Sequence, residues 1–210
     1  MQTPIKICEL HMTNKKQNKT HMKKRILNGL VASVIVLTTL SFATMNKEVN
    51  VKESNVTWTG KKVTGAHTGT IQLKSGHFKV EDEKLIGGEF VMDMTSIVNS
   101  DLTGEYKGKL EGHLKSEDFF GVEKYPTAKL VITNVAKKGE GTYDVVANLT
   151  IKDKTKPVTF DLDWKENSAS AKLSIDRSKY DIRYGSGSFF DDLGDKTIYD
   201  NFDLDVTLKF

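Results

Sequence analysis

The side chains best suited to binding an apolar ligand gather in one segment, His113–Lys129, which reads HLKSEDFFGVEKYPTAK. Phe119, Phe120 and Tyr125 supply large apolar surfaces, and Pro126 restricts Tyr125 to extended backbone, which directs its ring. The segment separates strand-like stretches, and loops hold most of the binding residues in all-β proteins. We expect it to form the mouth of an apolar interior. A plug that only closes one end of the structure is the alternative.

Catalytic and metal-binding motifs are missing from the sequence. It contains no GxSxG nucleophile elbow and no HxH or HExxH pair. Asp191, Asp192 and Asp195 do not match the spacing of an EF-hand, which leaves at most a weak surface calcium site. Asp161 and Asp163 share one face of a predicted strand, but it is the solvated face, which argues against a glycosidase pair. We therefore predict no catalytic residue, no resident metal and no cofactor.

Alternation of apolar and polar residues dominates the chain beyond residue 50. Such a period-two pattern places one face of a strand in an apolar environment and the other in water. The clearest sets are Phe202, Leu204, Val206, Leu208 and Phe210; Val145, Ala147, Leu149 and Ile151; Val158, Phe160, Leu162 and Trp164; and Ala171, Leu173 and Ile175.

Turn-like breaks recur about every 8 to 12 residues, as in antiparallel sandwiches and barrels. We place them at Lys74–Gly76, Gly87–Gly88, Lys138–Gly141, Lys154–Pro157 and Glu166–Ser168. The expected fold is all-β, an extended antiparallel barrel of about eight strands, with the aromatic segment at one end.

One stretch has helical spacing instead. Gly104–Lys115 carries Tyr106, Leu110 and Leu114 four residues apart, which gives a single apolar stripe. Two glycines weaken its helix propensity. We expect a short helix lying against the barrel.

The N-terminal region resembles an export signal. Met22–Arg25 is basic, Ile26–Ala43 is apolar or small, and Ser41-Phe42-Ala43 suits signal peptidase. We interpret residues 22–43 as a signal peptide, which predicts a periplasmic or extracellular protein. An uncleaved anchor is the alternative, since about 18 to 20 apolar residues can span a bilayer. Residues 1–21 are interpreted as an over-extended start.

Charge and cysteine content narrow the function further. Residues 1–43 hold seven of the 31 Lys and Arg residues and one of the 28 acids, so the remainder has a formal net charge of −3. A mildly acidic surface argues against nucleic-acid binding. The one cysteine, Cys8, lies in the leader, so the predicted exported domain has no disulfide, thiolate nucleophile or cysteine-bound metal.

Four stretches together resemble the YceI-like family of lipid- and polyisoprenoid-binding proteins. They are VTWTGKKVTGAHTGTIQL, HLKSEDFFGVEKYPTA, LTIKDKTKPVTF and IDRSKYDIRYG, in the family's order. The resemblance covers residues 50–210. It implies a lipocalin-like barrel with an apolar tunnel, export to the bacterial periplasm and binding of a long isoprenoid chain. The family offers no catalytic residues to carry over.

A barrel of about eight strands either fills itself with side chains or encloses one slim ligand. We predict an apolar ligand-binding lining, with a fully packed core as the alternative. Its members are Trp58, Phe78, Phe90, Met92, Phe119, Phe120, Tyr125, Phe160, Leu173 and Phe189.

Three polar side chains are predicted to bind the ligand at one end of the tunnel. His67, Arg177 and Tyr184 could converge there with Asp118 and bind a quinone carbonyl or a phosphate through charge-assisted hydrogen bonds. The alternative is a structural ion pair in which Asp176 and Asp118 hold Arg177.

The function predicted from these features is that of a binding or carrier protein, not an enzyme. Its ligand is an isoprenoid or another long-chain lipid, and transient contact with a membrane surface is expected. Two alternatives stay open: an accessory protein or enzyme in quinone- or isoprenoid-linked redox or stress handling, and an empty barrel that binds proteins.

Overall fold

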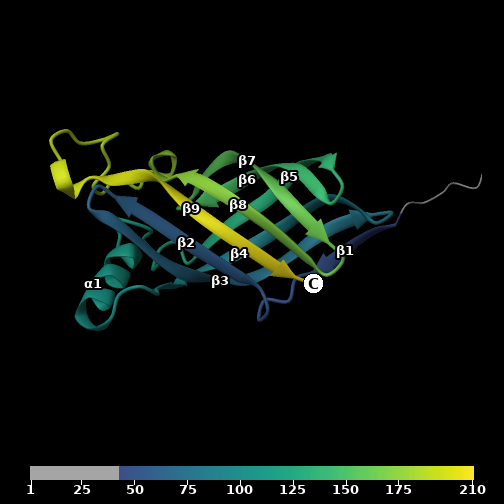
Figure 1. The fold of residues 1–210 in the computed structure, drawn as a ribbon, viewed down its shortest axis with the longest axis horizontal. Helices are drawn as coiled ribbons and strands as arrows, with labels where there is room; N and C mark the ends of the chain where they lie inside the picture. The colour runs from purple at the N-terminus through teal and green to yellow at the C-terminus, as the bar shows by residue number, and fades with distance from the viewer. Residues whose placement is uncertain (1–42) are drawn as a thin grey trace, which may run out of the picture. The chain divides into compact units, whose positions relative to one another are not determined.

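The computed structural model describes residues 43–210, which form a closed antiparallel barrel with one short helix at one end (Figure 1). Apart from Ala43, the predicted leader and signal peptide lie outside the described residues. The strands are β1 (Thr44–Glu48), β2 (Asn55–Lys62), β3 (Gly65–Glu81), β4 (Lys84–Asn99), β5 (Thr127–Gly139), β6 (Thr142–Ile151), β7 (Lys154–Lys165), β8 (Ser168–Asp176) and β9 (Ile198–Lys209).

Eight of these strands make the barrel. They pair in the order β3-β2-β9-β8-β7-β6-β5-β4, and the pairing of β4 with β3 closes the ring. β1 pairs with the second half of β3, Thr44 opposite Glu81, whereas β2 pairs with its first half. The prediction of a barrel of about eight strands is confirmed.

The alternation explains which side chains fill the interior. In β6, Val145, Ala147, Leu149 and Ile151 are all buried, while the residues between them are exposed or half-buried. Burying a side chain of this size stabilises the fold by about 1.5 to 3 kcal/mol, so the pattern fixes which face turns inward.

The predicted turns at Lys74–Gly76 and Gly87–Gly88 are wrong, because both segments lie inside strands. Gly76 and Gly88 lie in β3 and β4 on either side of the Phe90 ring. A Cβ atom at Gly76 would come within 2.6 Å of Phe90 Cδ1, and one at Gly88 within 2.9 Å of the His77 carbonyl oxygen. These glycines make space for an aromatic ring and do not turn the chain. The turn between β3 and β4 is instead Asp82–Glu83, both with positive φ.

The predicted break at Lys154–Pro157 is also wrong, because this segment begins β7. The turn before it is Lys152–Asp153, again with positive φ at both residues. Pro157 is tolerated because β8 pairs with β7 only from Leu162 onward, so no ladder hydrogen bond is lost on that side.

The predicted helix is present over the expected residues as α1 (Gly104–Lys115), packed against β4. Leu114 is buried and Leu110 half-buried, as expected, but Tyr106 is 74% exposed and does not join the apolar stripe. We call this end of the barrel the helix end. The segment Arg177–Thr197, with 3-10 turns η1 (Arg177–Tyr180) and η2 (Gly194–Lys196), lies at the same end (Figure 1).

Within residues 43–210, no helix is long and apolar enough to cross a membrane.

Candidate functional site

The barrel encloses a cavity of about 190 Å³ whose lining comes from all eight barrel strands. On β9 alone it extends from Ile198 to Leu208, so it follows most of the length of that strand. The charged side chains that line it, among residues 43–210, are Lys129 and Arg177. Lys129 is held by Glu89 at 2.7 Å on the outside. The interior is therefore hollow and almost entirely apolar.

Most of the predicted apolar set borders this cavity. The members that line it are Trp58, Phe78, Phe90, Met92, Phe119, Phe120, Phe160 and Leu173. Tyr125 and Phe189 do not. The Tyr125 hydroxyl lies 3.4 Å from Asp153, and Phe189 is 40% exposed with the Arg183 guanidinium 5.0 Å from its ring centroid. A ligand-binding role for these eight side chains stays a prediction.

Several lining residues were missed by the sequence reasoning. Met94 and Ile97 continue the inward face of β4 beyond Met92, and the period-two spacing of Phe90, Met92 and Met94 was a usable signal. Gly60 and Tyr199 also line the cavity. Gly60 continues the period-two spacing of Val56 and Trp58 but carries no apolar side chain, and no sequence pattern pointed to Tyr199.

Aromatic rings close the end of the barrel opposite the helix, which we call the sealed end. The Phe78 ring packs edge-on against Phe90 and Trp164, both at 4.8 Å between centroids, and Trp164 stacks on Phe210 at 4.8 Å. Lys47 Nζ lies 4.3 Å from the Phe210 centroid and donates to the Glu166 carbonyl at 2.7 Å. Such contacts add about 0.5 to 1.5 kcal/mol per aromatic pair, so this end is tightly packed.

Phe119 is packed among other side chains near the helix end and lines the cavity. It is only 7% exposed, and its ring contacts His113 at 5.6 Å and Phe120 at 5.1 Å between centroids. The Arg177 guanidinium lies 5.5 Å from the Phe119 centroid. Burial lowers the pKa of His113, against a smaller upward effect of Asp118, which favours the neutral ring. The aromatic segment thus supplies Phe119 and Phe120 to the cavity lining, and whether it acts as a mouth or as a plug stays a prediction.

Arg177 is almost fully buried, with 2% exposure, and lines the cavity. Its guanidinium donates to the carbonyls of Ile182 at 2.8 Å, Ile198 at 3.0 Å and Tyr199 at 3.3 Å. Asp200 lies 3.4 Å away. Burial lowers the pKa of Arg177, while the nearby carboxylates act in the opposite direction. The side chain therefore ties the segment after β8 to the start of β9.

The partners of Arg177 differ from those considered from the sequence. Asp176 does not hold the guanidinium by a hydrogen bond, because its carboxylate accepts from the backbone N–H and hydroxyl of Ser178 at 3.0 and 2.6 Å. Asp118 makes no ion pair with Arg177. Asp200, which the sequence did not single out, is the carboxylate nearest to it.

His67 and Tyr184 lie outside the cavity lining. His67 Nδ1 lies 2.9 Å from Asp101, and Tyr184 is exposed, with its ring 4.2 Å from the His113 ring centroid. Only Arg177 among the three predicted polar residues therefore borders the cavity.

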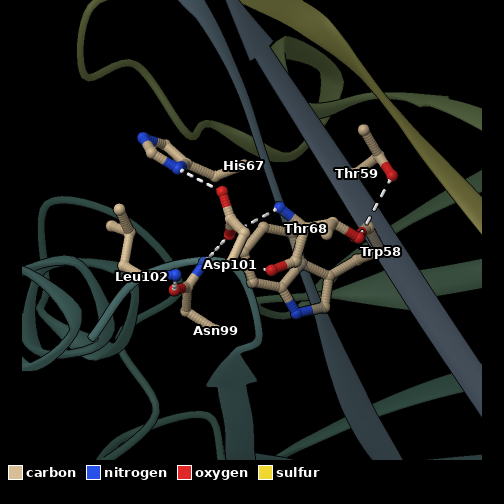
Figure 2. Close-up of polar contacts among 7 residues, drawn as sticks. All are labelled: Trp58, Thr59, His67, Thr68, Asn99, Asp101 and Leu102. Carbon is tan, nitrogen blue, oxygen red and sulfur yellow. Dashed lines mark hydrogen bonds and ion pairs between the residues drawn. The ribbon is translucent and has the colours of Figure 1, made fainter.

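His67 belongs to a polar network that joins β3 to the segment between β4 and α1 (Figure 2). Asp101 accepts from the Thr68 backbone N–H at 3.1 Å and from the Asn99 side-chain amide. Asn99 also donates to the Thr68 carbonyl at 2.9 Å and accepts from the Leu102 N–H at 2.8 Å. The network holds the segment that leads from β4 into α1 against β3.

The Asp101 network predicts an acid-sensitive contribution to stability. Burial alone would raise the pKa of Asp101, but hydrogen bonds from His67, Thr68 and Asn99 outweigh it and lower the pKa from 3.8 to about 2. A carboxyl with a lowered pKa stabilises the fold above its unfolded value and loses this contribution as pH falls through its folded value. The difference in unfolding free energy between wild type and Asp101→Asn should therefore shrink from about pH 4 to about pH 2. Urea unfolding at several pH values measures it, and a pH-independent difference would contradict the assignment.

Gly69, opposite Trp58 on β3, leaves the space that the Trp58 ring occupies in the cavity wall. A Cβ atom at Gly69 would collide with the Val98 carbonyl oxygen and lie 2.5 Å from Trp58 Cζ2. We expect Gly69→Ala to destabilise the protein by about 1 to 3 kcal/mol, because neither the backbone oxygen nor the packed indole can move freely. Chemical denaturation measures this, with Gly108→Ala on the open surface of α1 as a control, where a Cβ meets nothing within 4 Å. Equal stability of Gly69→Ala and wild type would show that the Trp58 ring shifts at no cost.

Comparison with known proteins identifies the family. The sequence profile of the YceI-like domain matches residues 48–210. The chain belongs to the YceI-like family. A UPF0312 protein of Shewanella denitrificans is 29% identical over 150 residues, which is 66% of this chain and 71% of that protein. Matches to Pseudomonas putida relatives span less than half of those proteins.

Two solved structures share the fold of this YceI-like barrel. BcnA of Burkholderia cenocepacia is 22% identical with a TM-score of 0.61, over 76% of this chain and 98% of that one. A polyisoprenoid-binding domain from Saccharophagus degradans, described as implicated in plant cell wall breakdown, is 15% identical with a TM-score of 0.56, over 80% of this chain and 97% of that one. At these identities the likeness concerns the fold.

Proposed function

We propose that this YceI-like protein binds and carries a long apolar chain, an isoprenoid or a similar lipid, inside its barrel. The observation that carries the proposal is the hollow, apolar interior, lined on all sides by the inward faces of the strands. The structural neighbour from Saccharophagus degradans, a polyisoprenoid-binding domain, supports the same ligand class. Each CH₂-sized group that leaves water for such an interior contributes about 0.8 kcal/mol.

The size of the cavity limits how a long chain can bind. A cavity of about 150 Å³ holds one benzene, and drug-sized ligands occupy about 300 to 1,000 Å³. The 190 Å³ available here therefore accommodates a short apolar segment without rearrangement. A longer chain has to displace interior side chains, and the rings of Phe119 and Phe120 at the helix end are the ones that we expect to move.

A binding role accounts for the lining better than an enzymatic one. Acid–base chemistry needs a titratable group within hydrogen-bond reach of the reacting atom. The two charged side chains that border the cavity are committed elsewhere: Lys129 to Glu89, and Arg177 to three backbone carbonyls. We therefore favour a carrier over an enzyme of quinone- or isoprenoid-linked metabolism.

Solvent extraction of the purified protein, followed by mass spectrometry, tests the proposal. We expect a prenyl or other long-chain lipid in near-stoichiometric amount, or saturable uptake of such a lipid by the delipidated protein. Protein that is free of lipid and takes up neither prenyl nor straight-chain lipid would exclude a carrier.

We place this carrier outside the cytoplasm, in the periplasm or the extracellular space, because of the signal-like residues 22–43. Fractionation of cells that produce the full chain tests this. Retention of an uncleaved protein in the cytoplasm would contradict it.

Contact with a membrane surface is part of the proposal. Among residues 43–210, the exposed aromatic side chains are Tyr106, Tyr184, Phe189, Phe190 and Tyr199, and their segments all lie at the helix end (Figure 1). Aromatic side chains favour membrane–water interfaces. Flotation with phosphatidylcholine vesicles should weaken when Phe189 and Phe190 are both replaced by serine. Unchanged flotation would place the membrane contact elsewhere.

A further inference from the structure

The ladder between β2 and β9 is interrupted near the helix end. It is regular from Asn55 opposite Thr207 to Gly60 opposite Phe202, and resumes only with Lys62 opposite Ile198. Three residues of β9, Tyr199 to Asn201, thus face a single residue of β2. Such a bulge bends one strand away from its neighbour and interrupts the hydrogen bonding between them.

The side chains at this interruption connect the cavity to the surface. Gly60 lines the cavity, and a Cβ atom placed on it would meet nothing within 4 Å. Tyr199 lines the cavity as well, yet it is 51% exposed. The open space at Gly60 belongs to the cavity, and Tyr199, at the interrupted ladder, borders both this interior and solvent, which marks a gap in the barrel wall.

Two other weak points of the wall are covered. The β3–β4 ladder is interrupted between Thr70 opposite Val98 and Gln72 opposite Asp93, but Met94 and Ile97 in this stretch are buried. β7 has no partner in β8 before Leu162, and β8 has no partner in β7 after Ala171. At the helix end, however, η1 packs against the unpaired part of the wall at β7. Tyr180 and Ile182, in and just after η1, are 1% and 0% exposed and belong to the hydrophobic core. Phe119, in the aromatic segment, is also buried. The gap beside Gly60 is not covered in this way.

The gap is held in place by specific hydrogen bonds. Arg177 donates to the carbonyls of Ile198 and Tyr199, at the point where β9 departs from β2. The Ile198 N–H donates to the Gly185 carbonyl at 2.8 Å, and the Val63 N–H to the Thr197 carbonyl at 3.1 Å. Buried backbone groups that leave a ladder need such partners, so the interruption is a built feature and not a frayed strand end.

We propose that the apolar chain of the ligand enters and leaves the barrel between β2 and β9, through the gap beside Gly60, and that the Tyr199 side chain gates this portal. The inference rests on the proposed lipid-carrying function and adds the route by which the ligand reaches the cavity. A gate changes the barrier for passage more than the energies of the free and bound states. Uptake and release should therefore change together.

The test compares rates of uptake and release of a farnesol-length chain carrying a small fluorophore, delivered from phosphatidylcholine vesicles to the delipidated protein. Gly60→Trp places an indole in the open space and should slow both uptake and release by about tenfold or more, whereas a side chain that only filled the cavity would weaken binding and speed release. Tyr199→Ala should accelerate both rates. Thr57→Trp, on the outward face of β2, is the matched control and should behave like wild type.

The outcomes separate the portal from the carrier function. Saturable uptake by wild type, with rates unchanged in both Gly60→Trp and Tyr199→Ala, would overturn the portal but leave the carrier. Faster uptake by Phe119→Ala without any effect of Gly60→Trp would move the portal to the aromatic segment. No uptake by wild type, with this probe or any other prenyl chain, would overturn both. If Gly60→Trp does not fold, Tyr199→Ala alone decides the question.

Discussion

Arg177→Met is expected to lower the free energy of unfolding by about 3 to 5 kcal/mol, and the Tm by about 10 °C. The guanidinium is 2% exposed and donates to three backbone carbonyls. Methionine approximates its aliphatic stem but leaves these acceptors without a donor, and a buried acceptor without a partner costs about 1 to 3 kcal/mol. Thermal and urea unfolding of the two proteins measure the effect.

Arg183 offers the matched control. Its side chain is 59% exposed, forms its ion pair with Asp181 and lies 5.0 Å from the Phe189 ring centroid. Arg183→Met should change stability by less than about 1 kcal/mol, because exposed ion pairs contribute little. If both substitutions had the same small effect, the carbonyls of Ile198 and Tyr199 would have found other partners, and Arg177 could not be the side chain that holds the start of β9.

Ala171→Phe is expected to weaken binding of a prenyl chain by about 100-fold or more. Ala171 is buried in β8 and lines the cavity. A benzene ring occupies a cavity of about 150 Å³, so a phenyl side chain at this position would take most of the 190 Å³. Excluding four CH₂-sized groups of a ligand costs about 3 kcal/mol, which corresponds to a factor of more than 100 in Kd. Equilibrium titration of the delipidated protein with a prenyl probe measures it.

The same substitution on the outer face separates a filled cavity from a disturbed fold. Ser174, on the same strand as Ala171, is exposed, and Ser174→Phe should leave binding unchanged. Circular dichroism and a thermal melt check that Ala171→Phe keeps the barrel. A folded Ala171→Phe protein that binds prenyl lipid like wild type would mean that the ligand lies outside this cavity.

Most of the architecture was accessible from the sequence because its signal is local. Period-two alternation in β6 to β9 identifies the inward faces without knowledge of strand order, and the helical spacing of Leu110 and Leu114 identifies α1. Gly76 and Gly88 misled the reasoning for a physical reason. A glycine that turns the chain and a glycine that makes space for a ring on the neighbouring strand look alike until the register is known.

The same difference between local sequence signals and long-range contacts decides which site residues could be predicted. Eight lining residues were predicted because six of them lie on strands with alternating patterns, and the other two, Phe119 and Phe120, lie next to each other in one aromatic segment. Phe189 looked equally suitable, but it lies in an irregular segment where no periodicity reports which side chains face solvent. The partners of Arg177 are 5 to 22 positions away in sequence and are backbone atoms, which leave no trace in residue types. Gly60 and Tyr199 border the same cavity only because β2 pairs with β9 in the fold.

The tight packing of Phe78, Phe90, Trp164 and Phe210 gives the barrel a direction. A ligand that cannot pass the sealed end would insert with its hydrocarbon tail first. Any polar head group would then stay near the helix end and would leave first. The distance from Ile198 to Leu208 along β9, roughly 33 Å at about 3.3 Å per residue, then sets an upper bound on the depth of insertion. Chain units beyond that depth would lie in solvent or in a bilayer and would not add to the binding free energy. The sealed end would therefore limit the length of chain that contributes to affinity.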